Sequence, residues 1–101
     1  MNTLVANKVK QIEQLCIKYD VKSMYLFGSS SSGNFTDLSD IDILVEFKEL
    51  SFDKYTDNYF YLHYALESLL ERKIDLVTVN SLSNPYFIQS IEQTKQLLYA
   101  A

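Results

Sequence analysis

The chain has 101 residues, of which 48% are hydrophobic and 22% charged, and its formal net charge is −4. This length and composition predict one folded domain over residues 1–101 and exclude a disordered or fibrous chain. Its nine basic residues form no basic run, so we expect no direct nucleic-acid binding. No apolar run approaches the roughly 20 residues that span a bilayer, so we expect no membrane contact. The single cysteine, Cys16, predicts a reducing, cytoplasmic location.

Two apolar stretches precede a serine-rich segment. Residues 3–19 carry apolar side chains at spacings of three and four, which predicts one amphipathic helix. That stripe consists of Val5, Val9, Ile12, Cys16 and Tyr19. Cys16 lies within it, so we expect a buried and unreactive thiol. Residues 24–27 are apolar and stop at Gly28, which predicts a short buried strand.

The rest of the chain alternates between strand and helix patterns. The predicted elements are strands at 41–47 and 74–79 and helical regions at 51–71 and 85–99. Ser51 is the expected N-cap of the first helical region, and Asn84-Pro85 is expected to start the second, as one or two helices. The apolar stripe of the first region comprises Phe52, Tyr55, Tyr59, Leu62, Leu66 and Leu69. The order of elements predicts a single α/β layer structure.

The serine-rich segment 28–33 reads GSSSSG, and three common kinds of loop fit it poorly. Its glycine spacing matches a P-loop, but Asn34 and Phe35 stand where that loop needs lysine and Ser or Thr. A Gly/Ser linker joins domains, and the 27 residues before it are too few to form a core. A calcium loop that starts at Asp37 would need glycine at the position of Asp42.

Three aspartates are candidates for a metal site. Asp40 and Asp42 are two residues apart at the start of a predicted strand, so alternation points both to one face. Taken alone, such a pair is common at exposed strand ends. Asp75 lies inside another predicted strand, where a charge is costly unless it is paired. It either pairs with Arg72 or Lys73, or joins the other two carboxylates around magnesium ions.

These residues resemble a known family. The GS at 28–29, ten further residues and the DID at 40–42 resemble the G-S-x10-D-x-D signature of the DNA polymerase β-like nucleotidyltransferases. The similarity is greatest to the minimal nucleotidyltransferases (MNT or MntA-like proteins) and continues through "DILVEF" and "RKIDLV", which contains Asp75. It covers nearly the whole chain. It implies a polymerase β-like α+β fold, with a small mixed sheet of three or slightly more strands flanked by helices.

The resemblance implies roles for five residues. Asp40, Asp42 and Asp75 would be the catalytic residues and the ligands of one or two Mg²⁺ ions. Asp75 would also help to deprotonate the attacking hydroxyl. Gly28 and Ser29 would bind the β- and γ-phosphates of a nucleoside triphosphate, with ATP as the expected substrate. The implied reaction is attack on the α-phosphate, with transfer of AMP and loss of pyrophosphate.

The resemblance also implies a partner. Minimal nucleotidyltransferases of this size are commonly antitoxins of HEPN-type toxins, so we expect a hetero-oligomer or homo-oligomer and AMP transfer to a toxin hydroxyl. The branch often has arginine where Ser32 stands. This difference leaves open a non-catalytic antitoxin that acts by binding. A small-molecule, aminoglycoside-type nucleotidyltransferase is a further alternative, although 101 residues leave little room for its substrate site.

Three other polar residues have simpler interpretations. His63 is the single histidine and has no neighbouring cysteine, so we expect a packing or surface role and no zinc site. Ser30 and Ser31 are expected to be ordinary loop residues.

Overall fold

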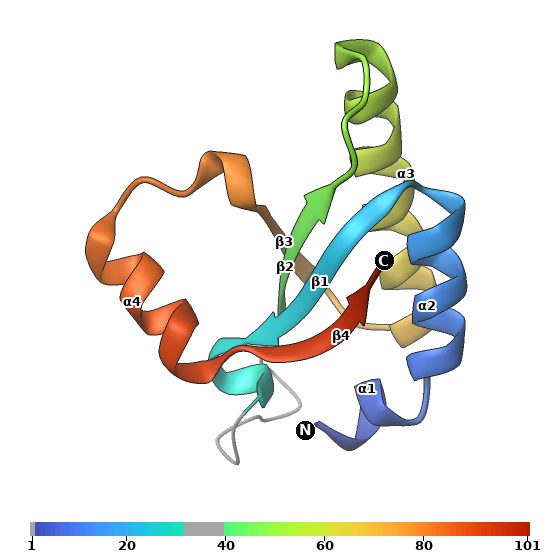
Figure 1. Cartoon of the computed structure of the whole chain (residues 1–101). Helices are drawn as coiled ribbons and strands as arrows, with labels where there is room; N and C mark the ends of the chain where they lie inside the picture. Colours follow the sequence, from blue (N-terminus) through green and yellow to red (C-terminus); the bar gives the residue numbers. More distant parts are fainter. Residues whose placement is uncertain (1, 32–39) are drawn as a thin grey trace.

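A computed structural model describes residues 2–31 and 40–101. Its strands form one four-stranded sheet in the order β3-β2-β1-β4 (Figure 1). They are β1 (Val21–Phe27), β2 (Ile41–Phe47), β3 (Ile74–Thr78) and β4 (Gln96–Ala100). β1 pairs antiparallel with β2 and β4, whereas β2 and β3 are parallel. The predicted α/β fold with a small mixed sheet is confirmed.

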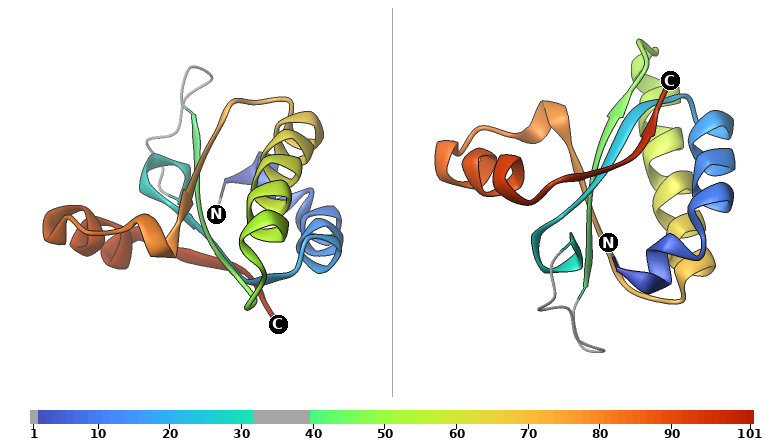
Figure 2. Two further views of the ribbon diagram at one scale, coloured as in Figure 1. Left: turned by 90° about the horizontal axis from the view of Figure 1, so that it is seen from above. Right: turned by 60° about the horizontal axis from the view of Figure 1, so that its bottom comes forward.

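Helices cover both faces of the sheet, but unequally. On one side lie α1 (Thr3–Ala6), α2 (Val9–Lys18) and α3 (Phe52–Leu70), and on the other lies α4 (Pro85–Thr94) (Figure 2). The larger core lies under α2 and α3 and takes Ile41, Ile43, Val45 and Phe47 from β2, as their alternation predicted. A smaller cluster on the α4 side contains Phe27, Leu44 and Ile91. β2 therefore contributes to both clusters, with Asp42 and Glu46 partly exposed on the α4 side.

Side-chain caps define the starts of two helices. The Ser51 hydroxyl accepts a hydrogen bond from the Lys54 N–H at 3.3 Å, so α3 begins where the sequence predicted. The Asn84 side chain accepts from the N–H groups of Tyr86 and Phe87 at 2.9 and 3.3 Å, and Pro85 occupies the first turn. None of the helices in the described parts of the chain is long and apolar enough to cross a membrane.

The N-terminal prediction of one helix over residues 3–19 was wrong. The Asn2 side chain caps a separate short helix, α1, by accepting from Leu4 N–H at 2.8 Å. The chain then turns at Asn7 and Lys8 before α2 begins. Val5 in α1 and Ile12 in α2 are both fully buried in the core. The following strand starts at Val21, which pairs with Phe47, rather than at residue 24.

The predicted helical region 85–99 was also wrong in its second half. The helix ends at Thr94, and Lys95 is extended, with φ −63° and ψ 139°. Residues 96–100 then add β4 to the free side of β1, which buries Leu98. Pairing with β1 decides this structure, because strand preference depends strongly on tertiary context. The predicted stripe of α3 was wrong at Phe52, whose side chain is 82% exposed.

Candidate active site

Parallel pairing of β2 and β3 places Asp42 beside Asp75. The two residues are register partners on neighbouring strands. Alternation directs the Asp42 side chain away from Ile41 and Ile43, toward the face that carries Leu44 and α4. Asp40 is exposed and directly precedes β2. Asp42 and Asp75 therefore lie side by side on the paired strands β2 and β3. Asp40, the third predicted carboxylate, directly precedes β2.

The surroundings of Asp75 differ from the sequence-based expectation. The sequence suggested a charge in the middle of a buried strand. Asp75 is instead exposed, at the second position of β3, and β3 is an edge strand. The carboxylate therefore needs no ion pair to offset burial, and that argument for the site was wrong. The contact with the Asp42 strand is what brings the acids together.

The pKa of the Asp42 carboxyl reflects the surroundings of this site. Burial, and to a smaller extent the nearby charges of Asp75 and Asp40, together raise the pKa of its carboxyl to about 6. Each of these causes disfavours the ionised form. A bound cation would act in the opposite sense and favour the carboxylate.

The carboxylates of Asp42 and Asp75, with Asp40 nearby, have the chemistry of a magnesium site. The described residues contain no group of three or more His, Cys, Asp and Glu side chains arranged to bind a metal ion. Mg²⁺, however, is usually bound through one or two carboxylates together with substrate phosphates and waters. Adjacent Asp42 and Asp75, with mutually repelling charges, match that donor chemistry.

A glycine turn packs directly against Asp42. Phe27, the last residue of β1, is the register partner of Asp42, and Gly28 then starts the 3₁₀ turn η1 (Gly28–Ser31). Gly28 has φ +65°, and a Cβ atom there would lie 2.7 Å from the Asp42 Oδ2 atom. Glycine is thus required both by the backbone angle and by the close approach of the carboxylate.

Ser30 and Ser31 are structural parts of this turn, so their interpretation as ordinary loop residues was wrong. The fully buried Ser30 hydroxyl accepts from the Asp42 N–H at 2.9 Å and donates to the Asp40 carbonyl at 3.4 Å. Ser31 donates to the Gly28 carbonyl at 2.9 Å. These bonds join the turn to the start of β2. A serine run in the sequence gives no signal for such long-range partners.

Thr94, which the sequence did not single out, binds the other side of the turn. Its hydroxyl oxygen accepts from the Gly28 N–H at 3.0 Å and donates to the Ser90 carbonyl at 3.0 Å. The Gly28 N–H is thereby occupied, so phosphate contacts at this turn would use other donors. Ser29 follows Gly28 in the turn and is partly exposed. Ser32, at the position of the family arginine, lies outside the described residues.

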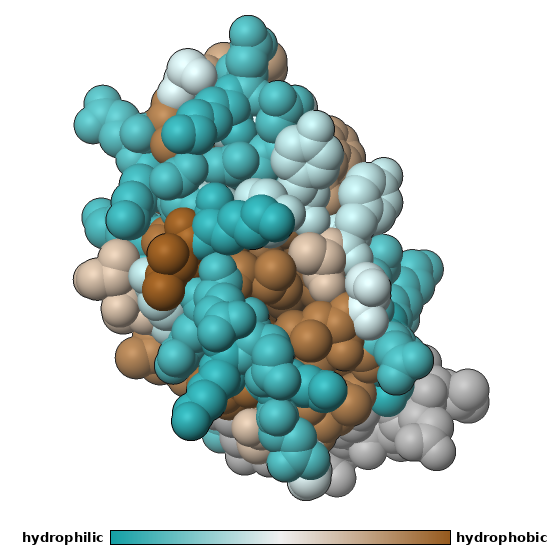
Figure 3. All heavy atoms as spheres, turned by 90° about the vertical axis from the view of Figure 1, so that its right-hand side faces the viewer, coloured by the Kyte–Doolittle hydropathy of each residue, from teal (hydrophilic) through white to brown (hydrophobic). Residues whose placement is uncertain are grey.

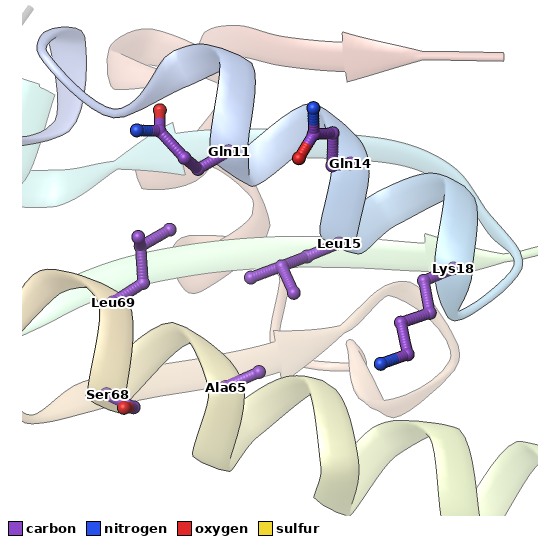
Figure 4. Close-up of a pocket in the computed structure, with 7 residues that line it drawn as sticks. All are labelled: Gln11, Gln14, Leu15, Lys18, Ala65, Ser68 and Leu69. Carbon is purple, nitrogen blue, oxygen red and sulfur yellow. The ribbon is translucent and has the colours of Figure 1, made fainter.

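A groove of the described surface lies away from these acids. It has a volume of about 450 Å³ and runs between α2 and α3, on the sheet face opposite α4 (Figure 4). Its lining residues are Gln11, Gln14, Leu15, Lys18, Ala65, Ser68 and Leu69. Apolar surface lies between hydrophilic side chains on this side of the molecule (Figure 3). The lining offers no carboxylate to bind a metal ion, so the acids across the sheet remain the candidate site.

His63 contacts the backbone of β3. Its Nε2 atom lies 2.9 Å from the Ile74 carbonyl oxygen and 3.5 Å from Glu67 Oε2. This arrangement agrees with the predicted packing or surface role.

Comparison with known proteins places this geometry in a family. The model of the nucleotidyltransferase domain matches residues 8–98. The chain belongs to the nucleotidyltransferase family. The match includes the turn at Gly28 and all three aspartates, and the resemblance to minimal nucleotidyltransferases is confirmed.

Individual relatives of this nucleotidyltransferase support the same family assignment. It is 47% identical over 76 residues, or 75% of each chain, to "Putative protein adenylyltransferase MJ1379" of Methanocaldococcus jannaschii. A solved "putative minimal nucleotidyltransferase" superposes with a TM-score of 0.78 at 25% identity, covering 95% of both chains. A structure of an MNT antitoxin with a tri-AMPylated Shewanella oneidensis HEPN toxin gives a TM-score of 0.66 at 25% identity, covering 95% of this chain and 72% of the other.

Proposed function

We propose that this nucleotidyltransferase transfers AMP from ATP to a hydroxyl group of a HEPN-type toxin and thereby acts as its antitoxin. The observation that carries the proposal is the parallel pairing of Asp42 with Asp75 beside the Gly28 turn. The relative named as a protein adenylyltransferase and the solved complex with an AMPylated HEPN toxin support the nucleotide and the partner.

The residues of the chain would bind the metal ions, accept a proton and position the substrate. Asp40, Asp42 and Asp75 would hold one or two Mg²⁺ ions. When bound, Mg²⁺ neutralises phosphate charge and orients the α-phosphate for in-line attack. Asp75, the more exposed of the paired acids, would accept the proton of the attacking hydroxyl.

The turn would align the triphosphate. The absence of a side chain at Gly28 lets the Asp42 carboxylate pack against the turn, which would bring the metal ligand close to the phosphates bound there. The Ser29 hydroxyl would donate to the β- and γ-phosphates. As the toxin oxygen bonds to the α-phosphorus, the bond to the bridging oxygen breaks and pyrophosphate leaves. Most of the rate enhancement would come from positioning and charge stabilisation.

The competing function is neutralisation by binding alone. The serine at position 32, where this branch often has arginine, favours this alternative because arginine gives bidentate phosphate contacts. A binding antitoxin would still suppress its toxin after Asp40 and Asp42 are both replaced by asparagine. An adenylyltransferase would not.

The direct test combines the protein, ATP, Mg²⁺ and a candidate HEPN partner. The proposal expects the intact mass of the partner to rise by one or more AMP units while its RNase activity falls. An unchanged mass together with unchanged toxicity overturns the function. An unchanged mass with lost toxicity supports the binding antitoxin instead.

A further inference from the structure

Edge strand β3 is held along its outer side by one row of α3 side chains. β3 has five residues and pairs only with β2 in the described sheet. An edge strand leaves a line of backbone N–H and C=O groups without strand partners. Here three of these groups are bonded by side chains, so the edge is covered by a helix.

The row consists of Tyr59, His63 and Glu67. They are four residues apart and therefore share one face of α3. The Tyr59 hydroxyl donates to the Leu76 carbonyl at 2.8 Å. His63 Nε2 lies 2.9 Å from the Ile74 carbonyl, and Glu67 Oε2 accepts from the Ile74 N–H at 3.1 Å.

These hydrogen bonds are made to the residues on either side of Asp75. Ile74 and Leu76 are its two chain neighbours, and both are tied to α3, while Asp75 itself is in register with Asp42. A shift of β3 along β2 would therefore break the bonds to α3 and move the Asp75 carboxylate away from Asp42. α3 is itself anchored by the fully buried side chains of Leu62 and Leu66, so the row has a rigid base.

We infer that Tyr59, His63 and Glu67 are positioning residues that fix the Asp75 carboxylate for cation and substrate. The inference rests on the proposed nucleotidyl transfer. The row acts on Asp75 through the backbone of β3 and touches no substrate itself. Partners that orient metal ligands in this way typically change metal affinity or activity by about 10- to 100-fold when they are removed.

The decisive comparison uses two substitutions of His63. His63→Leu removes the donor to the Ile74 carbonyl, whereas His63→Gln places an amide N–H near the same position. Tyr64→Phe is the matched control, because Tyr64 is the next residue of α3 and its side chain is 63% exposed. Tyr59→Phe removes one hydroxyl and tests the same row if His63→Leu does not fold.

The first measurement needs no turnover. Mn²⁺ is titrated into each ¹⁵N-labelled protein, and paramagnetic broadening of the Asp42 and Asp75 amide signals reports the bound ion. We expect His63→Leu and Tyr59→Phe to need about 10-fold more Mn²⁺ for the same broadening. His63→Gln and Tyr64→Phe should match the unchanged chain.

The second measurement is the rate of AMP transfer. His63→Leu should lower kcat about 10-fold while the KM for the partner protein stays unchanged. Equal Mn²⁺ titrations for all variants, or equal losses in His63→Leu and His63→Gln, overturn the positioning role. If the unchanged chain shows site-specific Mn²⁺ broadening but transfers no AMP, the proposed function fails while the titration still decides the positioning role. Absence of broadening in the unchanged chain overturns both.

Discussion

At the scale of single residues, the contact between Gly28 and Asp42 is the tightest constraint on the site. The left-handed backbone of Gly28 and the 2.7 Å approach to Asp42 Oδ2 leave no room for a β-carbon. A side chain there must strain the turn, move the carboxylate, or do both. The glycine of the family signature therefore has a direct structural reason in this chain.

Gly28→Ala should be destabilising for that reason. A left-handed backbone costs about 1–2 kcal/mol for a residue with a β-carbon, before the clash with Asp42 is counted. Denaturant unfolding of the two proteins measures the difference. A variant as stable as the unchanged chain would contradict the close approach.

Asp42→Asn should stabilise the metal-free protein at neutral pH. Because the pKa of Asp42 is about 6 in the folded chain and 3.8 ordinarily, the folded state binds the proton more tightly. Its contribution to stability is therefore lost as pH rises from about 4 to 6, and the penalty is complete above that range. The side chain is only partly buried, so screening reduces the gain to about 1 kcal/mol.

The measurement is the free energy of unfolding of both proteins between pH 4 and pH 7, in the presence of a chelator. The advantage of Asp42→Asn should grow across the interval and then level off. A difference that does not vary with pH would show that neither burial nor the neighbouring acids raise the pKa of Asp42.

The sequence predicted the site residues whose signals are local, and it missed those whose partners are distant along the chain. Asp40, Asp42 and Asp75 stood out because charge and alternation are local signals. Ser30 and Thr94 did not, because their partners lie 12 and 66 residues away. A hydroxyl that bonds to a distant backbone group looks like any other hydroxyl in the sequence.

At the scale of helices and strands, elements with local sequence signals were predicted correctly, and elements that depend on tertiary contacts were not. β2 and the starts of α3 and α4 carry local signals, namely alternation, Ser51 and Asn84-Pro85. β4 exists because β1 offers a free edge, and no local pattern records that.

The junction of α4 and β4 also anchors the candidate site through Thr94. Thr94→Val keeps the shape of the side chain but removes the acceptor of the Gly28 N–H. We expect a loss of about 1 kcal/mol in stability and faster hydrogen exchange of the Gly28 amide. Thr94→Ser keeps the hydroxyl and should preserve both. Equal behaviour of the two variants would mean that the bond does not hold the turn.

At the scale of the whole molecule, the sheet separates two surfaces. α4 lies on one side and α2 and α3 lie on the other (Figure 2). Alternation along β2 directs the Asp42 side chain toward the α4 side, whereas the groove lies between α2 and α3. The fold keeps the packed core under α2 and α3 and leaves the carboxylates near the sheet end where β2 and β3 begin. Nucleotide chemistry can therefore occur without disturbing the main core.

We propose that the Asp42–Asp75 pair is required for nucleotidyl transfer. The most direct test uses ATP labelled at the α-phosphate, Mg²⁺ and a HEPN-type partner, with the unchanged chain, Asp42→Asn and Asp57→Asn. Asp57 is an exposed acid on α3 and serves as the matched control. We predict label on the partner with the unchanged chain and Asp57→Asn, and none with folded Asp42→Asn. Equal labelling by Asp42→Asn would show that the Asp42–Asp75 pair is not needed for transfer.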